Sequence, residues 1–278
     1  MSVYKSMDGR QQILGQYQQI LSFWPGPYEF HHIDTEYGNT FVIESGSKEG
    51  LPLVLLHGSA SNSSMWLGDA AVLGRAHRVF AVDIIGEPGN SDESRPKMNN
   101  GHYARWIQQV LDGLNVGKAA VVGNSFGGWV ALDLATHAPE RVRALILLAS
   151  SGLYPFRRSF ALKRLTNHIF TAQNNMDHSL INSAEMPEAV SAYFELIHRE
   201  FIPRPLHAPV FGGKALASLI MPVLYIGGKL DTLLNTTKSA ARLKRHVPHA
   251  DVRVLPDTGH IVINQADNIS VFLSTQEI

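Results

Sequence analysis

Five uninterrupted apolar runs constrain the fold of this chain more than any other feature of its sequence. Apolar side chains occupy consecutive positions in each run, without alternation, and Gly, Asn or Asp residues bound the runs. Such runs are typical of strands buried on both faces, and helix-length segments separate most of them. The sequence therefore predicts an α/β fold, with a mostly parallel sheet flanked by helices. The runs cover residues 51–56, 79–82, 119–122, 144–148 and 223–226.

The segment before the first run predicts a helix and a β-hairpin. Apolar residues between positions 13 and 21 recur at helical spacing, with glutamines and charged residues between them. Residues 30–36 and 40–44 alternate in part about a turn that contains Gly38, which is the pattern of a hairpin. We therefore expect two further strands ahead of the parallel ones.

One connection is too long for a single βαβ crossover. It runs from residue 150 to residue 222, and residues 160–170 and 188–199 within it have helical character. We predict that residues 153–213 form a helical cap inserted into a core domain made of residues 1–152 and 214–278. The cap is rich in aromatic residues, which either attach it to the sheet domain or form the apolar wall of a substrate pocket.

Composition and charge exclude several classes of function. Lys plus Arg (24) balances Asp plus Glu (24), so the chain lacks the excess positive charge that binds a nucleic-acid backbone. Cysteine is absent, which excludes disulfides, thiolate metal sites and a cysteine nucleophile. The apolar runs are far shorter than the roughly 20 residues of a membrane-spanning helix. Residues 1–21 lack the apolar region of a secretory signal. We expect a cytoplasmic protein without a membrane span and without a nucleic-acid partner.

The third apolar run ends in Gly123-Asn124-Ser125-Phe126-Gly127, a Gly-x-Ser-x-Gly motif. A serine placed between two such glycines fits a sharp turn from a strand into a helix, because neighbouring side chains would collide with the turn. The motif follows a predicted strand and precedes a helical stretch, residues 130–137. Ser125 is therefore the candidate nucleophile.

A serine nucleophile needs a histidine base and a carboxylate that orients this base. In the fold that carries this elbow, the acid and then the histidine follow the serine, each after a later strand. Asp231 comes after the strand at residues 223–228, and His260 comes after residues 252–255. Residues 150–152, the alternative position for the acid, contain no carboxylate. The predicted triad is Ser125, His260 and Asp231.

The oxyanion of the tetrahedral intermediate needs two backbone donors. One is the N–H of Phe126, directly after the nucleophile. The other should come from the loop after the first long strand, where we select Ser59, with Ala60 as the alternative.

These motifs resemble those of the α/β-hydrolase family, in the cap-bearing branch with carboxylesterases, lipases, cofactor-free haloperoxidases and carbon-carbon bond hydrolases. The resemblance extends from about Phe30 to the C-terminus. It adds His57-Gly58, Asp83 leading to Ser91, and residues 139–142 to the motifs above. It implies an eight-stranded sheet with the cap after the sixth strand. One departure is that residues 87–90 make the loop before Ser91 one residue longer than the usual Gly-x-Gly-x-Ser form.

The resemblance implies roles for the same residues. Ser125 would be the nucleophile, His260 the general base and acid, and Asp231 its orienting carboxylate. Ser59 and Phe126 would donate to the oxyanion. No cofactor or metal is implied. Haloalkane dehalogenases and epoxide hydrolases of this fold have an aspartate at the elbow, so the serine excludes them.

The expected function is hydrolysis of small, neutral, apolar carboxylic esters through an acyl-enzyme, by a monomer or homodimer. Carbon-carbon bond or lactone hydrolysis by the same triad remains an alternative, as does a non-catalytic receptor for an apolar ligand. The pairs His31 with His32 and His246 with His249 are expected at the surface, because no further ligand stands at helical spacing. Asp83 is expected to brace the loops at the strand ends.

Overall fold

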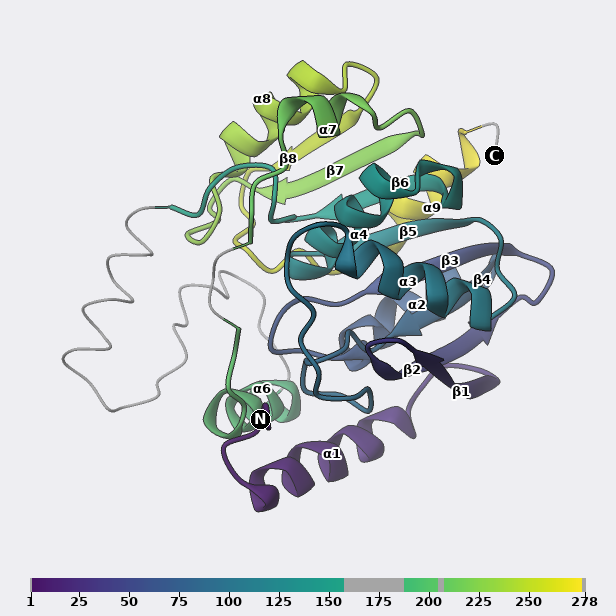
Figure 1. The fold of residues 1–278 in the computed structure, drawn as a ribbon, viewed down its shortest axis with the longest axis vertical. Coiled ribbons are helices and arrows are strands. Elements are labelled where there is room, and N and C mark those ends of the chain that lie inside the picture. Colours follow the sequence, from purple (N-terminus) through teal and green to yellow (C-terminus); the bar gives the residue numbers. More distant parts are fainter. Residues whose placement is uncertain (1, 158–187, 205–207, 277–278) are drawn as a thin grey trace.

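An eight-stranded sheet lies at the centre of the computed structural model, which describes residues 2–157, 188–204 and 208–276 (Figure 1). The strand order is β1-β2-β4-β3-β5-β6-β7-β8. β2 pairs antiparallel with β1 and with β4, and the other pairs are parallel. The predicted mostly parallel sheet is confirmed. The strands are β1 (Tyr28–Thr35), β2 (Gly38–Gly46), β3 (Leu51–Leu56), β4 (His77–Val82), β5 (Ala119–Asn124), β6 (Val142–Leu148), β7 (Val223–Gly228) and β8 (Asp251–Leu255).

Both faces of the parallel strands are buried, which explains why their sequences do not alternate. In β3, for example, Val54 and Leu56 point into one apolar cluster, and Leu53 and Leu55 point into another. All four side chains are fully buried. Residues of α3, α4, α7 and α8 complete the first cluster, and residues of α1, α2, α6 and α9 complete the second. The sheet is therefore the middle of three layers.

Most helices of the outer layers lie between successive strands in the chain (Figure 1). The exceptions are α1, which precedes β1, and α9, which follows β8. Short 3₁₀ turns, η1 and η2, precede α2 and β6. The helices are α1 (Met7–Leu21), α2 (Leu67–Leu73), α3 (His102–Gly113), α4 (Phe126–His137), α6 (Glu188–Glu200), α7 (Gly213–Ala217), α8 (Thr236–His246) and α9 (Ala266–Ser274), with η1 (Ser63–Trp66) and η2 (Pro139–Arg141).

The N-terminal segment packs against α6, far from it in sequence. Ile13, Tyr17 and Leu21 form the fully buried side of α1, as the helical spacing predicts. Just before α1, Tyr4 forms an antiparallel bridge with Phe201, the residue after α6. Figure 1 shows α1 and α6 next to each other, with the N-terminus close to α6. The N-terminal segment therefore fixes the position of the chain that leaves α6.

The predicted cap lies partly outside the described residues. β6 ends at Leu148 and β7 begins at Val223, with α6 and α7 between them. α6 confirms the helix expected at residues 188–199, whereas the helix expected at residues 160–170 falls outside the described ranges. The division of the chain at residues 153 and 213 stays a prediction.

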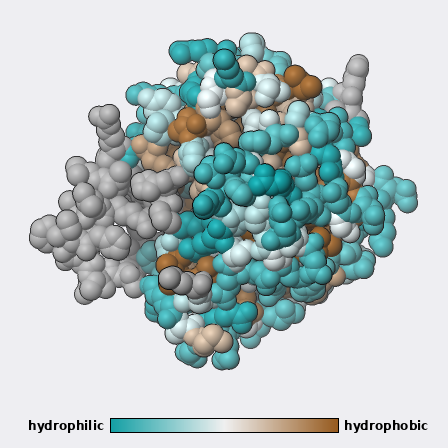
Figure 2. All heavy atoms as spheres, viewed as in Figure 1, coloured by the Kyte–Doolittle hydropathy of each residue, from teal (hydrophilic) through white to brown (hydrophobic). Residues whose placement is uncertain are grey.

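The visible surface is mainly hydrophilic, with hydrophobic residues scattered over it (Figure 2). The most exposed large apolar side chains include Ile220, at 80% exposure, and Phe23, at 74%. Among the residues that the structure describes, no helix combines the length and the apolar character needed to cross a bilayer.

Candidate active site

Ser125 stands at a strained turn between β5 and α4. Its backbone has φ 50° and ψ −106°, and α4 begins at the next residue. A Cβ atom on Gly127 would lie 2.2 Å from the carbonyl oxygen of Leu56, and one on Gly123 would lie 2.3 Å from the carbonyl oxygen of Gly127. Only glycine therefore fits on either side, as the nucleophile-elbow motif predicts. Strain of this kind persists only where the surrounding structure maintains it.

A continuous hydrogen-bonded chain joins Ser125 to His260 and Asp231. The distance from Ser125 Oγ to His260 Nε2 is 2.9 Å, and the distance from His260 Nδ1 to Asp231 Oδ2 is 2.8 Å. The carboxylate can only accept, so Nδ1 carries the proton and Nε2 is free to accept from the serine. The structure thus brings together the three residues that the sequence predicts as a triad.

Asp231 is held rigidly in place. It is 1% exposed, and its Oδ1 accepts the backbone N–H groups of Leu233 and Leu234, both at 2.8 Å. The other oxygen is left for His260. Its burial places the carboxylate in a low-dielectric environment, where hydrogen bonds to a charge are strongest. The carboxylate therefore fixes both the tautomer and the orientation of the imidazole.

The two predicted oxyanion donors border the same cavity as Ser125. Phe126 is the first residue of α4, where backbone N–H groups lack an acceptor within the helix. The Ala60 N–H, the alternative donor, is occupied because it donates to Glu87 Oε2 at 2.7 Å. Within the described part of the chain, the Ser59 N–H has no acceptor. Ser59 is thus better placed than Ala60 to be the second donor.

The cavity at Ser125 is small and largely apolar. Its volume among the described residues is about 40 Å³. Four apolar side chains and one charged side chain, Arg204, contribute to its wall besides the residues already named. The complete lining is Ser59, Met98, Ser125, Phe126, Ser151, Phe156, Arg204, Ala208 and Leu233.

Asp83 joins several loops at the carboxyl end of the sheet. Its Oδ1 accepts from the hydroxyl of Tyr17 and the N–H of Ser63, both at 2.9 Å, and its Oδ2 accepts from the N–H of Asn90 at 2.8 Å. Its backbone oxygen also accepts from Ser91 Oγ. These contacts agree with the bracing role expected for Asp83.

His57 braces the loop that carries Ser59. The backbone N–H of Ile84 donates to His57 Nε2 at 2.8 Å, so the ring proton is on Nδ1, which lies 2.7 Å from the carbonyl oxygen of Gly58. Burial lowers the pKa of His57, because a charged imidazole would lose its hydration there. The neutral ring links the ends of β3 and β4. The His57-Gly58 pair in the sequence signals this position but not this contact.

Glu87 and Arg204 are the residues near the site that sequence reasoning missed. They form a buried ion pair with a distance of 2.9 Å between Arg204 Nε and Glu87 Oε1. Glu87 falls in the loop that is one residue longer than the usual motif. That unusual length is the only signal in the sequence, and it carries no information about the partner.

The histidine pairs do not form a second site. His249 Nε2 lies 3.0 Å from the carbonyl oxygen of Met221. His31 shares one region of the hairpin with Glu29 and Glu44, with ligand atoms within 4.8 Å of one another. The pairing of β1 with β2 creates this cluster, which helical spacing could not predict. Arg78 already forms an ion pair with Glu44 at 2.7 Å, so we assign no metal to it.

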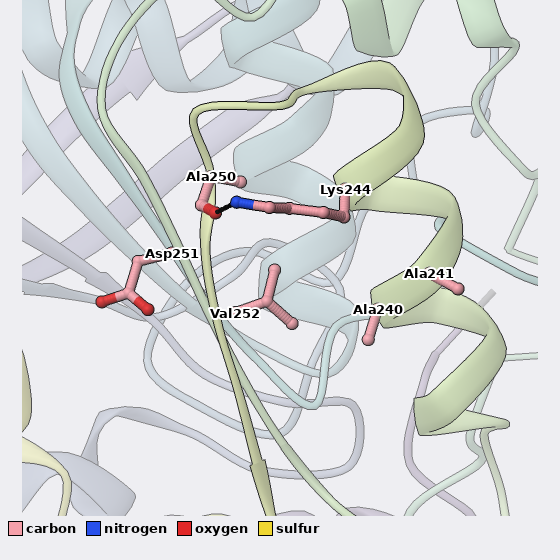
Figure 3. Close-up of a pocket in the computed structure, with 6 residues that line it drawn as sticks. All are labelled: Ala240, Ala241, Lys244, Ala250, Asp251 and Val252. Atoms are coloured by element: carbon pink, nitrogen blue, oxygen red, sulfur yellow. Dashed lines mark hydrogen bonds between the residues drawn. The ribbon is translucent and has the colours of Figure 1, made fainter.

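A wider hollow of about 410 Å³ lies between α8 and β8 (Figure 3). Its two charged side chains already have partners. Lys244 Nζ donates to the carbonyl oxygen of Ala250 at 2.8 Å, and Asp251 forms an ion pair with Arg253. The one carboxylate among its six described lining residues, Asp251, is engaged by Arg253 and has no serine or histidine beside it in that lining, so the smaller cavity at Ser125 is the candidate active site.

Known proteins resemble the chain over most of its length. The chain is 29% identical over 255 residues to an uncharacterized carboxylesterase, nap, of Bacillus subtilis, covering 88% of this chain and 85% of that protein. It is 26% identical over 263 residues to the carboxylesterase YbfK of Bacillus subtilis, with coverage of 88% and 86%. A crystal structure of YbfK aligns with a TM-score of 0.81 at 23% identity, covering 97% and 98% of the two chains.

A relative named for a different activity is also found. The 2-hydroxymuconate semialdehyde hydrolase of a Pseudomonas species (strain CF600) is 28% identical over 239 residues, covering 80% of this chain and 83% of that protein. A profile of the alpha/beta hydrolase family matches residues 53–270, which include the elbow and both of its partners. The chain therefore belongs to the alpha/beta hydrolase family.

Proposed function

We propose that the protein is a carboxylesterase that hydrolyses small, neutral, apolar esters through an acyl-enzyme on Ser125. The observation that carries this proposal is the hydrogen-bonded chain from Ser125 through His260 to the buried Asp231. The similarity to two carboxylesterases of Bacillus subtilis supports the ester bond as the target.

The proposed reaction begins when Ser125 Oγ attacks the ester carbonyl carbon and His260 Nε2 takes its proton. The carbonyl oxygen becomes an oxyanion that accepts from the N–H groups of Ser59 and Phe126. Asp231 stabilises the imidazolium that forms. When the intermediate collapses, His260 returns the proton to the leaving alcohol, and Ser125 holds the acyl group.

The second half of the reaction uses the same groups with water as the nucleophile. His260 takes a proton from water, and this water attacks the carbonyl carbon of the acyl group bound to Ser125. When this second intermediate collapses, the bond to Ser125 Oγ breaks, His260 returns its proton to that oxygen, and the acid leaves. The side chains of the triad supply the proton transfers, and this mechanism needs no cofactor or metal.

The character of the cavity supports a neutral substrate. Among the described lining residues, Met98, Phe156, Ala208 and Leu233 provide an apolar wall, and the single cation, Arg204, is already paired with Glu87. A carboxylate entering this cavity would lose its hydration without gaining an unpaired cation. We therefore expect short-chain neutral esters to be better substrates than esters of dicarboxylic acids.

The test is the steady-state hydrolysis of p-nitrophenyl acetate and butyrate by the wild type and by Ser125→Ala. The variant removes the nucleophile without disturbing the packing around it. It should therefore keep its thermal unfolding midpoint and lose turnover by at least about 10³-fold. Ser218→Ala, which changes an exposed serine outside the cavity, is the control and should keep its activity. Substantial turnover by Ser125→Ala would overturn the proposal.

Carbon-carbon bond hydrolysis is the second candidate, and the similarity to 2-hydroxymuconate semialdehyde hydrolase favours it. The same triad could activate water or serine against a carbonyl whose leaving group is a carbon acid. Kinetics with a ring-fission diketone beside the p-nitrophenyl esters separate the two. A kcat/KM for the diketone that exceeds the value for every ester tested would replace the first candidate with the second.

A further inference from the structure

We infer that Glu87 and Arg204 form a positioning pair that holds the oxyanion loop, residues 58–60, against the nucleophile. The inference rests on the proposed function, because it concerns the stabilisation of the oxyanion formed at Ser125. Neither residue is expected to touch the reacting atoms. Their contacts connect the loop that carries Ser59 to the chain that follows α6.

Glu87 uses each of its carboxylate oxygens for a different task. Oε2 accepts from the backbone N–H of Ala60 at 2.7 Å and from Ser59 Oγ at 3.3 Å. Oε1 accepts from Arg204 Nε at 2.9 Å. Its side chain is fully buried. A buried carboxylate with this arrangement binds the loop firmly, because losing any partner would leave a charge or a donor unsatisfied.

The backbone of the loop needs such support. Ala60 has φ 54°, in the left-handed region that a residue with a Cβ atom rarely adopts. The bond from its N–H to Glu87 compensates for this strain. The same bond removes Ala60 as a competing oxyanion donor and leaves the adjacent Ser59 N–H as the one without an acceptor in the described residues. Glu87 therefore selects which amide of the loop is available.

Arg204 fixes Glu87 from the opposite side. Its Nη2 donates to the carbonyl oxygen of Ile85 at 2.9 Å. The guanidinium therefore holds the loop after β4 at two points, Ile85 and Glu87. The guanidinium carbon also lies 5.4 Å from the ring centroids of Tyr103 and Phe126, within the range of cation–π contacts. Phe126 supplies the other proposed oxyanion donor. The buried Arg204 thus contacts Phe126, which supplies one proposed donor, and Glu87, which holds the loop that carries the other.

The position of Arg204 is set by residues outside the sheet. The chain leaving α6 is held by the bridge between Phe201 and Tyr4 and by the hydrogen bond from the N–H of Ile202 to the carbonyl oxygen of Val3, at 2.8 Å. Arg95 lies over the ring of Phe201 at 5.3 Å. The geometry of the oxyanion loop consequently depends on the N-terminal segment through Arg204.

Recognition of a substrate carboxylate is a different role for an arginine in this cavity. The structure favours the positioning role, because the charge of Arg204 is balanced by Glu87 at 2.9 Å and its Nη2 is used by Ile85. A substrate carboxylate would have to compete with Glu87 for the same cation. The positioning role predicts that a change at Arg204 affects neutral and anionic esters alike, whereas carboxylate recognition predicts a loss confined to anionic esters.

The experiment compares Glu87→Gln with the wild type in two measurements. The first is kcat and KM with p-nitrophenyl butyrate. The second is the inhibition constant of an alkyl trifluoromethyl ketone, whose adduct with a serine carries an oxyanion. Glutamine has the shape of glutamate but one acceptor oxygen instead of two, so it can serve Ala60 or Arg204 but not both. We expect kcat to fall and the inhibition constant to rise by about 10- to 100-fold, with KM nearly unchanged.

Glu44→Gln is the matched control. Glu44 is also buried and accepts from an arginine, Arg78 Nε, at 2.7 Å, but it lies on β2 and does not border the cavity. It should lose thermal stability without changing kcat or the inhibition constant. Equal kinetic losses in both variants, or wild-type kinetics in Glu87→Gln, would overturn the positioning role.

Arg204→Lys provides a second variant in case Glu87→Gln does not fold. Lysine keeps the charge, but its single ammonium group lacks the planar, forked donors with which the guanidinium reaches both Glu87 and Ile85. We expect the same fall in kcat and rise in the inhibition constant, but smaller than in Glu87→Gln. The fall in kcat should be equal for p-nitrophenyl butyrate and for a p-nitrophenyl hemisuccinate. A rise in KM confined to the hemisuccinate, or wild-type values throughout, would overturn the positioning role. A wild type that neither hydrolyses these esters nor binds the ketone would instead refute the proposed function itself.

Discussion

The two sides of Ser125 are built in different ways. On one side, His260 and Asp231 follow directly from β8 and β7, so the sheet itself brings the proton-transfer groups together. On the other side, the loop with Ser59 depends on Glu87 and Arg204, which are 117 positions apart in the chain. The first side needs only a correctly formed sheet. The second side needs the N-terminal segment and α6 to pack correctly as well, so damage far from the sheet should affect it selectively.

The largest expected effect comes from breaking the sheet-built side at Asp231. In Asp231→Asn, Oδ1 can still accept from Leu233 and Leu234, but the amide NH₂ then faces His260 Nδ1 and favours the wrong tautomer. We expect kcat for p-nitrophenyl butyrate to fall by about 10⁴-fold with the fold retained. Asp133→Asn is the control, since Asp133 is equally buried and accepts from the backbone of Ala104. A loss below tenfold in Asp231→Asn would contradict the assigned role.

A smaller effect is expected from loosening the other side at a distance. Phe201 is fully buried and touches Tyr4, and its replacement by alanine should cost about 3–5 kcal/mol of unfolding free energy. Because the chain leading to Arg204 loses its anchor, kcat should also fall, by about 10-fold. Urea unfolding and steady-state kinetics on the same preparation check both values.

Phe80→Ala is the matched control for this comparison. Phe80 is also fully buried, with an arginine, Arg78, 4.8 Å from the centre of its ring, but it lies in β4. It should lose similar stability and keep its kcat in conditions where it remains folded. If the two variants lost activity equally, the two sides of the site would not differ in their dependence on distant packing.

The smallest expected effect concerns pH and His57, which braces the loop with Ser59. Burial lowers the pKa of His57 below its ordinary value of 6.5, so the folded protein keeps the ring neutral while the unfolded chain takes up a proton. Its contribution to stability is therefore complete above about pH 6.5 and is lost as the pH falls toward the folded pKa. The loss is at most about 1.4 kcal/mol per pH unit.

His57→Gln removes this titration. The variant should be less stable at about pH 7.5, because it loses the ring that accepts from Ile84, but its stability should decline less steeply toward about pH 5 than that of the wild type. Urea unfolding at both pH values gives the two slopes. Identical slopes would mean that the ring is not held neutral in the folded protein.

The sequence was sufficient to predict the sheet and the proton-transfer side because both have short-range signals. Unbroken apolar runs mark strands covered on both faces, and the close packing at Gly123 and Gly127 explains why the elbow motif is specific. Asp231 and His260 could be predicted since each follows its strand directly. The sequence also predicted the N-terminal helix, from the spacing of residues such as Ile13 and Leu21.

The support of the oxyanion loop could not be predicted, because it has no local pattern. Glu87 looks like an ordinary loop residue, and Arg204 lies in a Pro-rich segment where nothing indicates a buried ion pair. The cluster of Glu29 and His31 with Glu44 was missed for a related reason, since only the register of β1 against β2 brings these side chains together. Contacts between distant segments require the tertiary structure.

Covalent labelling tests the central claim, that Ser125 is the nucleophile of a Ser-His-Asp triad, most directly. The protein is treated with an alkyl p-nitrophenyl phosphonate, and intact-mass and peptide mass spectrometry locate the adduct. We predict one phosphonyl group per chain, on Ser125, formed rapidly by the wild type and at a strongly reduced rate in His260→Ala. A wild type that remains unmodified, or an adduct on another residue such as Ser59 or Ser151, would contradict it.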